Sequence, residues 1–275
     1  MSVVTATIAD AKVATENPAA LNVASSHPVL TRRSLMRMAA LVGTSVVGSA
    51  VLAGCGSDDG VAATAAADPR PLTTEEAQRL AVVRFNNYDT GTRTITGTLT
   101  DGQVQVALSG WVDWIDHIGY GLAVPAPVGT GVDPGGPLLL RWTLGDVAQL
   151  DATGMASAPF PVPTTGWDNQ ALTAGDSFLA AGMLVLMNLG SDRPENPQLL
   201  AQSTSRWLRA DTVGGVAVDV MTGPSDATGK SGEGIRYWVD ATGVLRRLEV
   251  QLGGGLWSLV DFTDAPGIDL TADAG

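Results

Sequence analysis

The stretch TRTITGTLTDGQVQVALSGWVDW, from Thr92 to Trp114, alternates apolar and polar residues on both sides of the turn Thr100-Asp101-Gly102. Strict alternation is typical of a half-buried β-strand, and an Asp-Gly turn between two such runs indicates an antiparallel hairpin. This stretch therefore predicts a β-hairpin. The two-residue alternation of apolar and polar residues can then be looked for in the neighbouring segments.

The segment before the hairpin has a helical pattern. Thr73 is followed three residues later by Glu76, which is the spacing of a capping box at a helix N-terminus. We predict a helix from there to about Asn86. Its buried side would be formed by Leu72, Ala77, Leu80, Ala81 and Phe85.

The segments after the hairpin extend the sheet. HIGYGLAVPA and PLLLRWTLG continue the strand pattern, and a loop rich in Gly and Pro at 128–137 separates them. Five more strand-like runs lie between residues 206 and 264. Eight or nine strands, with helices inserted between two groups of them, predict an α+β fold.

The insert between the two groups of strands is unusually apolar. Within 172–189, the sequence SFLAAGMLVLMNLG places apolar residues on nearly every face of a helix. Such a helix is buried on several sides or borders something apolar. A short helix around 198–203 is expected to follow.

The chain has seven tryptophans, and five of them lie in predicted strands: Trp111, Trp142, Trp207, Trp238 and Trp257. They could fill the core of the sheet, or some of them could join the apolar helix in lining a cavity for an apolar ligand. The candidate lining residues are Phe178, Met183, Leu184, Met187, Trp111 and Trp238.

Several acidic motifs are better explained as turns than as functional sites. Asp-Ala-Thr-Gly occurs at Asp151, Asp226 and Asp240. It lacks the alternating acidic residues of a calcium loop, whereas Asp and Gly at these positions suit tight turns. GPSDATGKS at 223–231 lacks the first glycine of a phosphate-binding loop and precedes a strand, so we predict an ordinary loop.

Asp113, Asp116 and His117 lie together in WVDWIDHIGYG and are also expected to form a turn. A catalytic histidine needs a nucleophile and an orienting group, and a zinc site normally needs three or more ligands. No G-x-S-x-G or H-E-x-x-H motif occurs. The sequence therefore predicts no catalytic residues, no metal and no cofactor, and we expect a protein that is not an enzyme.

The N-terminal part reads as an export signal. Arg32, Arg33 and Arg37 precede a stretch without charged residues that ends in Leu52-Ala53-Gly54-Cys55. A basic flank, a modest apolar core and small residues at its end indicate a signal peptide. A retained transmembrane helix is the alternative, but glycines and hydroxyl residues dilute the apolar run.

The tetrapeptide ending at Cys55 is similar to the lipobox of bacterial lipoproteins. This resemblance implies that the Cys55 thiol receives a diacylglyceryl group, that the preceding bond is cut, and that acyl chains such as palmitate anchor the protein. Thr31 to Arg37 also resembles a twin-arginine signal, with Arg32 and Arg33 as the pair. A start at Met36 would remove that pair and leave a general secretory signal.

These motifs divide the chain. We expect a disordered leader at 1–30, a lipoprotein signal peptide at 31–54, a lipidated cysteine with a flexible tether at 55–71, and one β-rich domain at 72–275. The net charge of the whole chain is −12, and that of the part from Cys55 onward is about −14. Such an acidic protein is not expected to bind nucleic acid. No second cysteine exists, so no intramolecular disulfide can form.

The order of these features resembles the actinobacterial LppX/LprG-type lipoproteins and, more distantly, the LolA/LolB-like carriers. The features are the lipidated cysteine and tether, the first helix, the strand meander, the apolar insert and the closing strands with RYWVDATGVLRRLEV. The resemblance implies a curved antiparallel sheet, an unclosed half-barrel with helices on its concave side, whose hollow receives acyl chains.

The expected function is therefore that of a monomeric, membrane-anchored binder or carrier of a lipid or another apolar ligand. It would act on the extracytoplasmic face of the cell membrane, in the cell envelope. The alternative is an envelope protein-interaction or sensing module with the same fold, a filled core and no ligand cavity.

Overall fold

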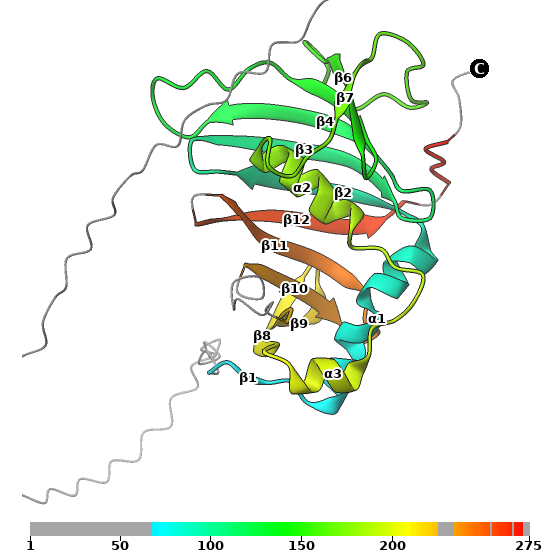
Figure 1. Ribbon diagram of the computed structural model, residues 1–275, viewed down its shortest axis with the longest axis vertical. Coiled ribbons are helices and arrows are strands. Elements are labelled where there is room, and N and C mark those ends of the chain that lie inside the picture. Colours follow the sequence, from blue (N-terminus) through cyan, green and yellow to red (C-terminus); the bar gives the residue numbers. More distant parts are fainter. Residues whose placement is uncertain (1–67, 225–233, 254, 266, 272–275) are drawn as a thin grey trace, which may run out of the picture. The chain divides into compact units, whose positions relative to one another are not determined.

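The computed structural model describes residues 68–224, 234–253, 255–265 and 267–271 (Figure 1). All of them belong to the compact unit formed by residues 62–275. The predicted leader, the signal residues Arg32 and Arg33, the lipidation site Cys55 and the turn at Asp226 lie outside the described residues.

The described strands form one antiparallel sheet of twelve strands in the order β1-β8-β9-β10-β11-β12-β2-β3-β4-β5-β6-β7. Its two end strands, β1 and β7, pair with β8 and β6 and not with each other, so the sheet is an unclosed half-barrel. The strands are β1 (Arg70–Pro71), β2 (Thr92–Thr100), β3 (Val104–Asp113), β4 (Ile118–Pro127), β5 (Leu138–Trp142), β6 (Asp146–Asp151), β7 (Asp168–Ala171), β8 (Arg206–Val213), β9 (Val216–Thr222), β10 (Ile235–Asp240), β11 (Leu245–Gly253) and β12 (Leu256–Asp264).

The predicted α+β class is confirmed, but the strand count is higher than the eight or nine expected. The sequence pattern did not reveal β1, β6 or β7. β1 has only two residues, and β7 has the sequence DNQA, in which every residue is exposed. An end strand without a buried side chain carries no alternation of apolar and polar residues, which is the signal used for prediction.

The first helix, α1 (Thr74–Thr90), begins with the predicted capping box. The Glu76 amide donates to Thr73 Oγ1 at 3.3 Å, and the Thr73 amide donates to Glu76 Oε2 at 2.8 Å. The helix runs one turn beyond the predicted end and stops at Gly91, whose φ of +73° is accessible to glycine without strain.

The other two helices lie where the apolar insert and the segment after it predict them. α2 (Phe178–Met187) begins after Ser177, whose hydroxyl accepts from the Ala180 amide at 3.0 Å. α3 (Pro197–Gln202) begins after Asn196, whose side chain accepts from the Gln198 amide at 2.9 Å.

All three helices pack on the same face of the sheet, and the main core lies between them and the strands. In Figure 1, α2 crosses β2 and β3, while α1 lies beside β10 and packs against α3. Along β3, the alternate residues Val106, Leu108 and Val112 point into this core. This is the concave face, and the predicted placement of the helices on it is confirmed.

Glycines let the middle strands curve on this face. A Cβ at Gly110 would overlap the carbonyl of Tyr120, and a Cβ at Gly97 would overlap the carbonyl of Leu259. Glycine inside a strand often marks a bend or a close approach of backbones. These positions let neighbouring strands lie closer than side chains would permit.

The outer face of the sheet carries two smaller clusters. Tyr120, Leu122 and Leu139 pack there under the loop 152–167 and the segment around Leu270, and Trp111 packs against this group. Trp238 forms the second cluster with Val218 and Val220. None of the helices in the described residues has the length and apolar content needed to cross a membrane.

Candidate functional site

The structure brings four of the six candidate lining residues together. Phe178, Met183, Leu184 and Met187 all lie on α2 and contact the main core, with Met183 and Met187 buried. Trp111 and Trp238 lie in the clusters on the outer face. Successive side chains in a strand point to opposite faces of the sheet. Val112, next to Trp111, and Val239, next to Trp238, point into the main core, so both tryptophans point away from the concave face.

Two clefts flank the first turns of α2. One of about 340 Å³ has an almost wholly apolar wall and opens toward the loop 128–137. It is lined by Val104, Val106, Ala123, Pro125, Pro134, Gly135, Gly136, Leu138, Ser177, Phe178 and Leu179. The other, of about 230 Å³, lies toward β6 and β7. It is lined by Leu138, Leu140, Val147, Gln149, Gln170, Ala171, Leu172, Asp176, Ser177, Leu179, Ala180 and Met183.

Three residues, Leu138, Ser177 and Leu179, line both clefts. We call the two clefts together the α2 groove. Of the predicted residues, Phe178 and Met183 line it. Leu184 and Met187 line neither cleft. Met187 is buried in the main core, and Leu184 is half-buried against it.

The polar groups of the α2 groove are concentrated at the β6–β7 end: Gln149, Gln170, Asp176 and Ser177. Among the described residues, no lysine or arginine lines either cleft. An apolar wall with a few polar groups at one end is typical of sites for small molecules. The one charged side chain at this end of the groove is the carboxylate of Asp176. The β6–β7 end therefore suits a ligand with uncharged hydrogen-bond donors better than an anionic ligand.

The strand residues of the groove were missed by sequence reasoning. Val104 and Val106 are in the alternating stretch that predicted the hairpin, so their inward direction could have been inferred. Leu138, Leu140 and Val147 could not be assigned to a site from the sequence, because their contact with α2 joins segments about 40 residues apart.

The C-terminal end of α2 is held by side chains from other elements. The Trp114 indole N–H donates to the Leu186 carbonyl at 2.8 Å, and Arg84 Nε donates to the Asn188 carbonyl at 2.9 Å. Asn87 donates to the Leu189 carbonyl at 2.9 Å. These bonds satisfy carbonyls that a helix end leaves without partners. The C-terminal end of α2 is thereby fixed, and the groove lies at its N-terminal end.

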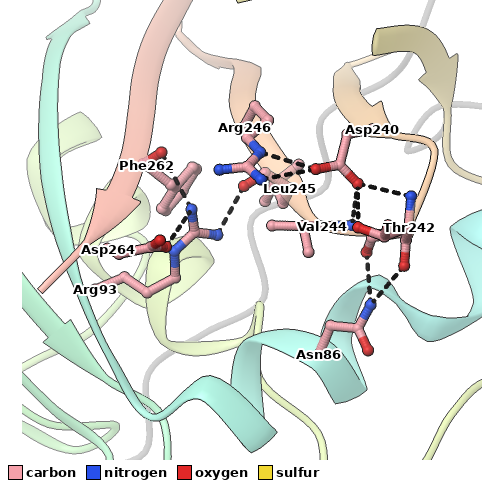
Figure 2. A network of polar contacts seen from close by, with 10 residues as sticks. Asn86, Arg93, Asp240, Thr242, Val244, Leu245, Arg246, Phe262 and Asp264 are labelled. Atoms are coloured by element: carbon pink, nitrogen blue, oxygen red, sulfur yellow. Dashed lines mark hydrogen bonds and ion pairs between the residues drawn. The ribbon is translucent and has the colours of Figure 1, made fainter. Parts of the chain in front are cut away.

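A polar network joins α1 to the β10–β11 turn (Figure 2). Asp240 Oδ1 accepts from Thr242 and from the Val244 amide, and Arg246 Nε donates to Asp240 Oδ2 at 2.9 Å. Burial alone would raise the pKa of Asp240, but these hydrogen bonds outweigh it and lower the pKa. From α1, Asn86 donates to the Gly243 carbonyl at 3.0 Å.

Arg93 lies in the same network and is fully buried. It donates to the Leu245 and Phe262 carbonyls at 2.7 and 3.1 Å (Figure 2). Burial lowers its pKa to about 10, so it remains charged at neutral pH. Every acceptor in the network belongs to the turn or the strands, so the network holds the fold together and offers no reactive group.

The acidic motifs form turns, as predicted, wherever the structure describes them. Asp151 and Asp240 each accept from the amide and the hydroxyl two residues later, and the motif glycines Gly154 and Gly243 have φ near +83°. Asp113 also closes a turn, because its Oδ1 accepts from the Ile115 and Asp116 amides. Among the described residues, no group of three or more potential ligands could hold a metal ion.

The described strands and helices define an unclosed antiparallel half-barrel with an apolar groove beside one helix. No family model matches the sequence, and no curated protein matches it. Among solved structures, LprF from Mycobacterium bovis has a similar fold, with a TM-score of 0.44 and 12% identity, over 75% of this chain and 100% of that one.

The Mycobacterium tuberculosis lipoprotein LppX is similar with a TM-score of 0.37 and 12% identity, over 72% of this chain and 97% of that one. A putative outer membrane lipoprotein-sorting protein domain from Vibrio parahaemolyticus has a TM-score of 0.27 and 12% identity, over 72% and 95%. Mycobacterial lipoproteins are thus among the structures that this fold resembles, which is the resemblance that the sequence suggests.

Proposed function

We propose that this protein is a non-enzymatic lipoprotein of the cell envelope that binds or carries a lipid or another apolar ligand in the α2 groove. The observation that carries the proposal is the groove itself, two clefts on either side of one helix with largely apolar walls, and with three uncharged polar groups and one carboxylate at one end. The larger cleft reaches the lower end of the roughly 300–1,000 Å³ that is typical of ligand sites.

Burial of hydrocarbon supplies the affinity. Each CH₂ group that leaves water contributes about 0.8 kcal/mol, so about ten such groups contribute on the order of 8 kcal/mol before the cost of ordering the chain. Leu138 and Leu179 lie between the two clefts. A ligand with two apolar branches could therefore place one branch on each side of Leu179.

The rim selects the polar part of the ligand. Gln149, Gln170 and Ser177 can exchange hydrogen bonds with hydroxyl or ester groups, whereas Asp176 repels a phosphate. The net negative charge of the whole chain also repels anionic ligands. The ligand class supported best is an uncharged lipid.

The anchor completes the proposal. Cys55 is the lipid attachment point, and Arg32 and Arg33 belong to the export signal, so the domain works within a short tether of the extracytoplasmic face of the membrane.

Native mass spectrometry of the protein purified from a lipid-containing host tests the proposal. We expect the wild type to carry an uncharged lipid, and Leu179→Trp to lose most of it, because the indole would occupy both clefts. Leu199→Trp is the matched control, since Leu199 is 66% exposed on α3 and remote from the groove.

The proposal fails if the wild type carries no lipid and also does not bind a neutral apolar probe such as N-phenyl-1-naphthylamine at micromolar concentrations. That result would favour the alternative, an interaction module with a filled core. An equal amount of lipid on the wild type and Leu179→Trp would move the site away from the groove.

A further inference from the structure

A second cavity, of about 410 Å³, lies on the outer face of the same strands that border the α2 groove. The register shows this directly, because Tyr120, Arg141, Ala148 and Asn169 pair across β4 to β7 and therefore share one face. We call this cavity the outer pocket. It is lined by Ile118, Arg141, Thr143, Asp146, Ala148, Thr164, Thr165, Gly166, Trp167 and Asn169.

The loop 152–167 forms one wall of the outer pocket and is held in place at its end. The Trp167 indole N–H donates to the Pro163 carbonyl at 2.7 Å. The Trp167 ring meets Tyr120 edge to face, with 6.4 Å between the ring centroids. The wall is thus fixed against the sheet and does not depend on a ligand for its position.

Arg141 is the unusual residue in this pocket. Within the part of the chain that the structure describes, each of the other ten arginines donates to a carboxylate or a carbonyl, whereas Arg141 makes no hydrogen bond or ion pair. Its side chain is half-buried and also lines an adjoining cavity of about 100 Å³. A half-buried guanidinium without a partner, facing a cavity, is poised for an anionic group.

The other lining groups restrict the anion. Among the described residues that line the outer pocket, Arg141 is the only cation, and Asp146 adds a negative charge. A singly charged carboxylate therefore fits better than a doubly charged phosphate. Thr164, Thr165 and Asn169 are exposed and can exchange hydrogen bonds with hydroxyl groups. Thr143 Oγ1 accepts from the Asp146 amide at 3.2 Å, which leaves its O–H free to donate.

We propose that the outer pocket binds a sugar residue that carries a carboxylate, of the uronic acid class. Arg141 receives the carboxylate with two parallel N–H donors, the threonines and Asn169 contact the hydroxyl groups, and Trp167 provides an apolar wall for the ring. The site lies on the opposite face of the sheet from the α2 groove, and its occupancy does not depend on the function proposed there.

Titration of the purified protein with D-glucuronate, D-glucose and inorganic phosphate, followed by the indole N–H resonances in NMR, tests this proposal. We expect glucuronate to bind at least about tenfold more tightly than glucose or phosphate, because a hydrogen-bonded charge pair is worth more than a neutral contact. The Trp167 resonance should shift, and Trp167→Phe identifies it.

Arg141→Gln should abolish the preference for glucuronate over glucose and leave the melting temperature unchanged, since Arg141 has no partner to lose among the described residues. Arg193→Gln, the same change at an exposed arginine between α2 and α3, should leave binding unchanged. Asn169→Ala, on the exposed end strand, should weaken glucuronate and glucose alike. The proposal is overturned if phosphate binds as tightly as glucuronate, if glucuronate binds no better than glucose, or if Arg141→Gln binds as the wild type does.

Discussion

Glu76 accepts three hydrogen bonds from two residues at the start of α1. Its carboxylate accepts two hydrogen bonds from Arg70, both at 2.7 Å, and one from the Thr73 amide. Arg70 also stacks on the Trp207 ring, with its guanidinium carbon 4.4 Å from the centroid. One buried carboxylate thereby ties β1, α1 and β8 together. The bond from Arg70 is the largest cause that lowers the pKa of Glu76 to about 2, against the opposing effect of burial.

The low pKa of Glu76 makes part of the stability depend on pH. Because its folded pKa lies below the ordinary value of 4.5, its contribution is complete above that pH and is lost as the pH falls from there toward 2. Glu76→Gln should lower the free energy of unfolding by about 1–3 kcal/mol at pH 7 and by much less at pH 2.5.

Urea unfolding at pH 7, 4 and 2.5 measures this difference. Glu75→Gln, a change at the exposed neighbour, serves as the control and should have little effect at any of these pH values. A penalty for Glu76→Gln that is the same at pH 7 and pH 2.5 would contradict the explanation.

At the scale of elements, the curvature of β2 to β4 depends on residues without side chains. Gly110 and Gly121 pair across β3 and β4, and each faces the backbone of the other strand too closely for a Cβ. The neighbouring inward positions Leu108 and Val112 are buried against the helices. The same strands therefore combine large side chains that fill the core with glycines that let the sheet bend around it.

Gly110→Val should be strongly destabilising, because the atoms that its Cβ would overlap belong to the Tyr120 carbonyl and cannot move independently of the strand. We expect a loss of about 1–3 kcal/mol or more, measured by urea unfolding. Gly129→Val is the matched control in the loop 128–137, where no atom lies within 4 Å of the added Cβ. Equal stability of the two variants would show that the close approach at Gly110 does not constrain the sheet.

At the scale of the whole molecule, β12 pairs with β2, so the last strand joins the first hairpin in the middle of the sheet. This pairing gives one continuous concave face for α1, α2 and α3. The segment before residue 68 lies outside the described residues, and its part in the molecule is a prediction from the sequence alone.

Cys55→Ser tests that prediction. The wild type, expressed in a bacterial host, should enter the detergent-rich phase of a Triton X-114 extraction with the added mass of acyl chains, because two chains make a durable anchor. Cys55→Ser should remain in the aqueous phase without that mass, and Ser57→Ala should behave as the wild type. Equal partition of Cys55→Ser and the wild type would rule out lipid attachment at this thiol.

Features that depend on residues close together in the chain could be predicted from the amino-acid sequence. Alternation of apolar and polar residues predicted the hairpin and the closing strands, Thr73 and Glu76 predicted the start of α1, and Asp-Ala-Thr-Gly predicted the turns at Asp151 and Asp240. A strand's period, a cap and a turn each involve only a few consecutive residues, so the local sequence is enough to predict them. Only the tertiary structure decided which distant segments meet. It placed Trp111 and Trp238 on the outer face and set Leu138 and Leu140 against α2. It also left Arg141, beside the loop 152–167, without a partner among the described residues. Those outcomes follow from the order of the strands and from which face of the sheet the helices cover, and neither can be inferred from the local pattern of one strand.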